Sequence, residues 1–151
     1  MSNQFHIITF GKKPENLLKT LESKTIGSFL RTFESHVKKG SIAFLHCKSL
    51  IWGAAVISSD YFYDESPLWS DKMYPHRFKI NQIYLVDEPI VLNNGHYNVA
   101  LKELAGTGWA YSFIFSPKPL PAETGMQIYK DVVARREVNS DLMSIKLSGS
   151  R

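Results

Sequence analysis

Apolar residues occur along this chain in short blocks. Two of them, residues 41–47 and 50–57, flank the polar pair Lys48-Ser49. Short apolar runs on either side of a two-residue polar break are typical of an antiparallel β-hairpin. A further β-branched and aromatic run, residues 4–10, ends at Gly11 and predicts a first strand. We therefore expect three buried strands before residue 58.

Between the first strand and the hairpin, the apolar spacing changes to that of a helix. Pro14 suits the first turn of a helix, and the leucines that follow on one face are Leu17, Leu18 and Leu21. Gly27-Ser28 interrupts this helix, and Ser28 can cap a second one. The apolar positions of that second helix are Phe29, Leu30, Phe33 and Val37. The pattern thus predicts two helices after strand one.

A stretch rich in aromatic residues follows the hairpin. Its rings are Tyr61, Phe62, Tyr63, Trp69 and Tyr74, and acidic residues, serines and Pro67 separate them. Neither the helical nor the strand period accounts for so many rings, so we predict a loop. An exposed aromatic loop beside a hairpin is a candidate ligand site.

The second half of the chain alternates between extended and helical patterns. We predict a strand over 78–86 that ends at Asp87-Glu88-Pro89, an extended segment to residue 92, and a turn at 93–95. Residues 98–104 favour a helix, and the apolar run 109–115 favours a last core strand. A proline-rich linker, 116–121, precedes a final helix with a buried stripe of Ile128, Tyr129, Val132 and Val133.

These elements predict an α+β protein. We expect a mixed β-barrel, or strongly bent sheet, of five or six strands, with two helices after strand one and one C-terminal helix. Strands do not alternate with helices, which disfavours a doubly wound parallel sheet. The 151 residues suit a single core. We expect one domain over 1–138 and a loosely ordered tail over 139–151.

Charge and cysteine content narrow the function classes. The formal charge of +4 is compatible with a polyanionic partner but is too small to identify one. The single cysteine, Cys47, lies in an apolar block, which predicts a core residue and no disulfide framework. No run of 18 apolar residues and no secretory leader pattern occurs, so we expect a cytoplasmic protein with no membrane partner.

The sequence offers little support for catalysis. The five histidines lack the spacing that places two metal ligands on one helical face, so no metal site is expected. Gly106-Thr107-Gly108 lacks the lysine and the spacing of a phosphate-binding loop. We therefore expect no cofactor and no catalytic residue.

The order of several short segments resembles the EVE domain and its relative the YTH domain, both of the PUA-like superfamily. The matching segments are IITF at 7–10, TIGS at 25–28, GSIAFL at 40–45, WGAAVIS at 52–58, Trp69, FKI at 78–80 and PLPAETG at 119–125. The resemblance covers residues 4–136. It implies a PUA-like pseudo-barrel whose aromatic pocket takes a modified base out of a nucleic acid strand, with Trp69 as one wall.

The resemblance and the neighbouring loops give a candidate site. The expected base-binding residues are Trp69, Ile26, Gly27, Ser28, Tyr63 and Asp64, and the expected phosphate-binding residues are Lys12, Lys13, Lys72, Arg77 and Lys79. The implied function is a non-catalytic module that binds DNA or RNA carrying a modified, methylated base. An associated nuclease or NTPase partner is left open.

One residue departs from the resemblance. YTH relatives place a second tryptophan after the first helix, where this chain has Ile26, and Phe29 could fill the gap from the next turn. Trp52 and Trp109 are expected in the core, whereas Trp69 is either a loop anchor or a ligand wall.

Two other functions remain open at this stage. One is an ASCH-type amidohydrolase or ribonuclease, which would recruit Lys24, Thr25 and Glu34. The other is a protein-binding domain that uses the aromatic loop as its interface.

Overall fold

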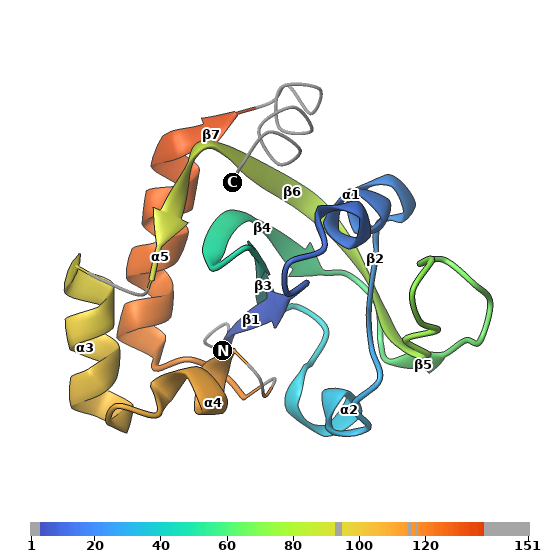
Figure 1. Cartoon of the computed structure of the whole chain (residues 1–151), viewed down its shortest axis with the longest axis horizontal. Helices are drawn as coiled ribbons and strands as arrows, with labels where there is room; N and C mark the ends of the chain where they lie inside the picture. Colours follow the sequence, from blue (N-terminus) through green and yellow to red (C-terminus); the bar gives the residue numbers. More distant parts are fainter. Residues whose placement is uncertain (1–3, 93–94, 115, 117, 138–151) are drawn as a thin grey trace.

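The described structure consists of seven strands and five helices, the strands forming one curled sheet. It is a computed structural model that describes residues 4–92, 95–114, 116 and 118–137. The elements are β1 (Phe5–Thr9), α1 (Pro14–Ser23), β2 (Thr25–Ser28), α2 (Thr32–His36), β3 (Ile42–Cys47), β4 (Leu50–Ile57), β5 (Phe62–Tyr63), β6 (His76–Val91), α3 (Gly95–Ala105), α4 (Trp109–Phe113), α5 (Ala122–Arg135) and β7 (Arg136–Glu137) (Figure 1). The predicted tail, 139–151, lies outside the described residues.

The sheet runs in the order β1-β3-β4-β6-β2, and β5 and β7 also pair with β6. β1 is parallel to β3, and the other described pairs are antiparallel. The long strand β6 curls across the molecule and joins the two sides of the sheet (Figure 1). This mixed, curled sheet with its helices confirms the predicted α+β, PUA-like fold class.

Helices cover both faces of the sheet. The largest hydrophobic cluster lies beneath α5, where Ile128 and Val132 are buried with Phe5 and Phe44, whose rings stack 5.9 Å apart. A second cluster joins α2 to the middle of the sheet, and a third packs α1 against β3 and β4. In the described residues no helix is long and apolar enough to cross a membrane.

The hairpin prediction is confirmed. β3 pairs antiparallel with β4 from Ile42↔Val56 to Cys47↔Leu50. Lys48 and Ser49 both have positive φ, as a two-residue hairpin turn of the favoured hand requires. Trp52 is buried, and its Nε1 donates to the Cys47 carbonyl over 2.9 Å, which confirms its core position. Trp109 is also buried.

Both helices predicted after strand one are present, but a strand that was not predicted lies between them. Residues 25–28 form β2, an edge strand that pairs with β6 from Thr25↔Lys79 to Ser28↔His76. The second helix, α2, is correspondingly short. The Ser28 hydroxyl accepts a hydrogen bond from the Leu30 N–H at 2.9 Å, so it closes a local turn instead of capping α2.

Two predictions in the second half also need correction. Residues 109–113 form helix α4 and not a strand, because a short apolar run fits either element. Pro89 does not end the strand: β6 continues to Val91. Its pairing with β4 jumps from Ile51↔Ile90 to Gly53↔Leu85, so Pro89 falls in a bulge, where its missing N–H breaks no regular ladder bond.

Candidate functional site

The end strands β1 and β2 are joined through the sheet but face each other across a gap that contains two adjoining cavities. The cavities measure about 190 and 200 Å³ and share the lining residues Thr9, Gly27, Phe29 and Tyr74. We call the pair the seam hollow. Its polar end is also lined by Phe10, Gly11, Lys13, Asn16 and Trp69, and its apolar end by Ile7, Ile8, Ser28, Leu30, Phe33, Ile114 and Ser116. Together the two cavities fall near the lower end of the roughly 300–1,000 Å³ range of small-molecule sites.

Trp69 forms part of the polar end and is fixed in place on several sides. Its side chain is only 6% exposed, its Nε1 donates to the Thr20 hydroxyl over 3.2 Å, and its ring meets Tyr74 edge-on at 5.5 Å. A Cβ at Gly27 would lie 2.6 Å from the indole Cη2, so only glycine allows this contact. Trp69 is therefore both a loop anchor and a wall of the hollow.

A hydrogen-bond network around the partly exposed Asp71 carboxylate organises the polar end. The carboxylate accepts hydrogen bonds from Lys13 Nζ at 2.6 Å, the Tyr74 hydroxyl at 2.6 Å and Asn16 Nδ2 at 3.1 Å. Desolvation raises the pKa of Asp71, but these three donors outweigh it and hold the pKa well below its usual value. Desolvation and the Asp71 carboxylate raise the pKa of Tyr74 to about 12. Near neutral pH the pair is a carboxylate and a neutral phenol.

Thr9 lies at the centre of the hollow and is oriented by its own partners. Its hydroxyl accepts from the Gly11 N–H at 3.1 Å and lies 3.0 Å from His46 Nδ1. Burial lowers the pKa of His46 to about 4, so the imidazole is neutral near pH 7. The hollow therefore presents a fixed, uncharged hydroxyl at this point.

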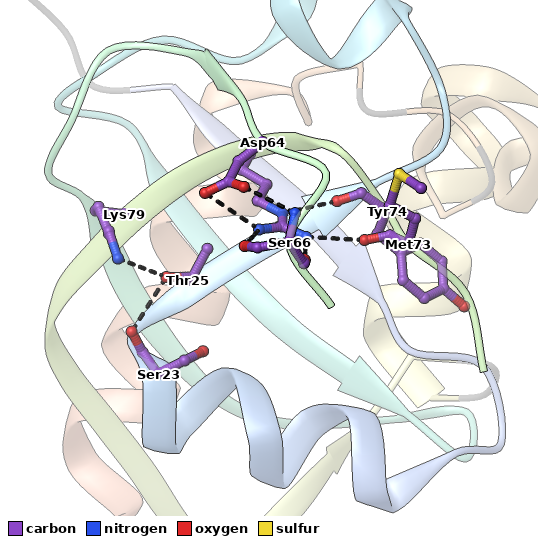
Figure 2. Close-up of polar contacts among 8 residues, drawn as sticks. Ser23, Thr25, Asp64, Ser66, Met73, Tyr74 and Lys79 are labelled. Carbon is purple, nitrogen blue, oxygen red and sulfur yellow. Dashed lines mark hydrogen bonds and ion pairs between the residues drawn. The ribbon is translucent and has the colours of Figure 1, made fainter. Parts of the chain in front are cut away.

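Arg77 has a different role from the predicted phosphate contact. Its side chain is 1% exposed, and its guanidinium donates to the carbonyls of Ser66, Met73 and Tyr74 and to the Ser66 hydroxyl (Figure 2). The Asp64 carboxylate lies 3.5 Å from Nη1, and the guanidinium stands 5.1 Å from the Trp69 ring. A group so enclosed has no donor left for a phosphate, and it instead holds together the loop that carries Trp69.

The other predicted base-binding residues separate into two groups. Trp69, Gly27 and Ser28 line the seam hollow. Ile26 is fully buried in the core behind it, because alternate residues of a strand face opposite sides. Tyr63 is 56% exposed and donates to Glu65, and neither Tyr63 nor Asp64 is among the lining residues, because β5 pairs them with the start of β6.

The predicted lysines also separate. Lys13 lines the polar end, and Lys12 is its exposed neighbour. Lys72 Nζ stands 5.1 Å over the ring of Phe29 at the edge of the hollow. Lys79 instead donates to the Thr25 hydroxyl over 3.0 Å, on the far side of Asp64 and Ser66 from Met73 and Tyr74 (Figure 2). Of the predicted lysines, Lys13 therefore lines the hollow and Lys72 contacts one of its lining residues.

Several lining residues escaped the sequence reasoning. Thr9, Phe10 and Asn16 were assigned only to a strand end and a helix, and Asp71 only to the loop. Nothing in the sequence singles these residues out, because Thr9 and Phe10 lie inside the predicted strand and Asn16 inside the predicted helix. Phe29, named as a substitute wall, is 62% exposed and lines both cavities.

In the described residues, the three side chains that an ASCH-type enzyme would use do not come together at the hollow. Thr25 is buried and its hydroxyl donates to the Ser23 carbonyl, and none of Lys24, Thr25 and Glu34 lines the hollow. Burial, the largest cause, raises the pKa of Cys47 to about 11, which favours the unreactive thiol. Within the described ranges, no three His, Cys, Asp or Glu side chains are grouped to hold a metal ion.

Comparison with known proteins gives structural matches alone. No protein-family model matches the chain, and no curated protein matches its sequence. Among solved structures, the YTH domain of the Zygosaccharomyces rouxii MRB1 protein in complex with N6-methyladenosine RNA matches with a TM-score of 0.59 and 17% identity over 86% of each chain. The Pho92 YTH domain in complex with m6A matches with a TM-score of 0.58 and 17% identity, also over 86% of each chain. The Mmi1 YTH domain in complex with RNA matches with a TM-score of 0.60 and 10% identity, over 88% of this chain and 79% of that one. At these identities the comparisons show that this chain has a fold similar to that of YTH domains.

Proposed function

We propose that this protein is a non-catalytic nucleic-acid-binding module of the EVE and YTH type that captures a modified base in the polar end of the seam hollow. The observation that carries the proposal is the meeting of Trp69, Tyr74 and Phe29 around one cavity, with Lys13 and Lys72 at its edge. Aromatic rings bind bases and lysines bind phosphates, so this cavity offers both parts of a nucleotide site. Structures of similar fold were solved in complex with methylated RNA, which supports the same assignment.

The strand edges add hydrogen-bonding groups to this site. The Ile42 N–H donates to the Gln4 carbonyl, and the Phe10 N–H donates to the His46 carbonyl, so even-numbered residues of β1 face β3. Because the bonding direction alternates along a strand, the N–H and C=O of Thr9 face the seam. On β2, the Ile80 N–H donates to the Lys24 carbonyl, which by the same alternation turns the backbone of Gly27 toward the seam. Backbone groups of Thr9 and Gly27 could therefore read the edge of a base.

Energetics favour a base already out of a duplex. Stacking on an aromatic side chain stabilises a bound base by about 1–3 kcal/mol, whereas extrusion from a duplex costs a few kcal/mol. Two or three lysine–phosphate contacts are few, so a single strand is the better substrate. We propose single-stranded RNA or DNA as the partner.

The proposal is tested by binding of short single-stranded oligonucleotides that differ only in one methylated base. Phe29→Ala should weaken binding about 5- to 150-fold, which corresponds to the 1–3 kcal/mol of one stacked base. Phe29 is largely exposed, so the melting temperature should hardly change. Fluorescence anisotropy gives the affinity and thermal unfolding the stability.

Val99→Ala is the matched control, because Val99 is another exposed apolar residue and lies on α3, outside the hollow. It should alter neither quantity. Equal affinity of the wild type and Phe29→Ala for every oligonucleotide would refute the aromatic site.

A further inference from the structure

A base bound in the polar end of the seam hollow would leave the apolar end empty. Its cavity of about 190 Å³ is walled by Ile7, Ile8, Leu30 and Phe33, and three of these side chains are buried. A methyl group on a base would occupy a small part of that volume, given that one water molecule takes about 30 Å³ of liquid. The cavity therefore has room for a much larger apolar group.

The two cavities adjoin at the centre of the hollow. Thr9, Gly27, Phe29 and Tyr74 line both of them. A substituent on a base in the polar end would therefore point toward the apolar end, past these four residues.

Residues 26 and 27 put no side chain into the hollow. Ile26 is fully buried and packs with Phe33 and Phe78 in the core, and the next residue, Gly27, has no side chain. At Gly27, which lines both cavities, β2 therefore presents only backbone to them.

We propose that the seam hollow selects a base that carries an apolar substituent of several carbon atoms, larger than a methyl group. This inference rests on the proposed function, since it assumes that the polar end holds the base. The polar groups at Lys13 and Asn16 then face the ring of the base, and the side chains of Ile7, Ile8, Leu30 and Phe33 surround its substituent.

The test uses two series of otherwise identical oligonucleotides. One series carries adenine, N6-methyladenine or N6-isopentenyladenine at a single position, and the other carries cytosine, 5-methylcytosine or 5-propynylcytosine. Burial of each further methylene group should strengthen binding about fourfold. The larger substituent of at least one series should therefore bind at least tenfold more tightly than the methyl group.

Leu30→Phe fills the apolar end, because Leu30 lines that cavity and is absent from the lining of the polar one. In this variant the preference for the larger substituent over the methyl group should vanish. Val99→Phe, on the exposed face of α3, is the control and should change neither affinity.

The wild-type series alone can overturn the inference. If methylated bases bind as tightly as the larger ones in both series, or more tightly, the apolar end receives no substituent, and the proposed function stands without it. If the Leu30→Phe variant still prefers the larger substituent, the apolar end again receives no substituent and only the proposed function stands. If modified and unmodified oligonucleotides bind equally or not at all, the proposed function fails together with this inference.

Discussion

At the residue scale, the seam hollow depends on a glycine that provides space. Gly27 lies against the indole of Trp69 and the carbonyl of Tyr74, and an added Cβ would stand 2.6 and 2.8 Å from them. The first neighbour is a buried ring and the second is backbone, so neither can move aside at low cost. Gly27 thus fixes how closely β2 approaches the loop that carries Trp69.

Gly27→Ala should therefore destabilise the protein by about 1–3 kcal/mol, the usual cost of overpacking, and should weaken oligonucleotide binding as the indole shifts. Gly108→Ala is the matched control, because a Cβ there meets nothing within 4 Å. Urea denaturation measures the stability of each variant. Equal midpoints for the two variants would show that the indole can move freely.

Trp69 was predicted from the family resemblance, but no residue pattern in the sequence predicts the residues that line the hollow with it. Asn16 and Thr9 read as a helix residue and a strand end, and they become site residues because the curled sheet brings β1 opposite β2. Arg77 was predicted to contact phosphate because it lies beside the aromatic loop in the sequence. Its burial results from carbonyl groups up to 11 positions away along the chain.

At the element scale, the sequence predicts those elements whose residues interact with near neighbours along the chain. The hairpin was predictable because its turn pair and both apolar blocks are contiguous. β2 was not, because four residues carry no periodicity and their partner strand lies about 50 positions further along. The helix at 109–113 was missed since a run of five mostly apolar residues is too short to show whether its period is that of a helix or of a strand.

The loop between β5 and β6 gives a prediction at this scale, because its conformation depends on one guanidinium. Arg77→Lys keeps the charge but cannot reproduce the planar set of donors, so at least one partly buried carbonyl should lose its partner, at a cost of about 1 kcal/mol or more. We expect a lower melting temperature and a changed Trp69 fluorescence. Arg31→Lys, at an exposed arginine, should leave both unchanged. An unaltered melting temperature in Arg77→Lys would mean that the loop is held by other contacts.

At the scale of the whole molecule, the net charge of +4 matters less than where the lysines lie. Lys13 and Lys72 stand at the hollow, whereas Lys79 is held by Thr25 on the other side of the Arg77 network. The sequence identifies these lysines but does not show which of them lie at the hollow. Their placement makes the salt dependence of binding a measure of which ones contact phosphates.

The affinity for a single strand should fall linearly on a logarithmic plot against salt, with a slope of about −0.7 for each phosphate contact. Lys72→Gln should reduce the slope by about 0.7, and Lys79→Gln should leave it unchanged. Titrations at several salt concentrations provide both slopes. The same slope in the Lys72→Gln variant and the wild type would remove Lys72 from the phosphate-binding set.

The sheet order also has a consequence for the rate of binding. Two of the segments that line the hollow, β1 and β2, are the two ends of a single sheet and are linked through β3, β4 and β6. Moving these two strands apart would require bending that entire ladder, so this part of the hollow exists before its ligand arrives. The association rate is then limited by how often a base unstacks from its neighbours. Single strands with weak stacking around the modified base should therefore bind fastest.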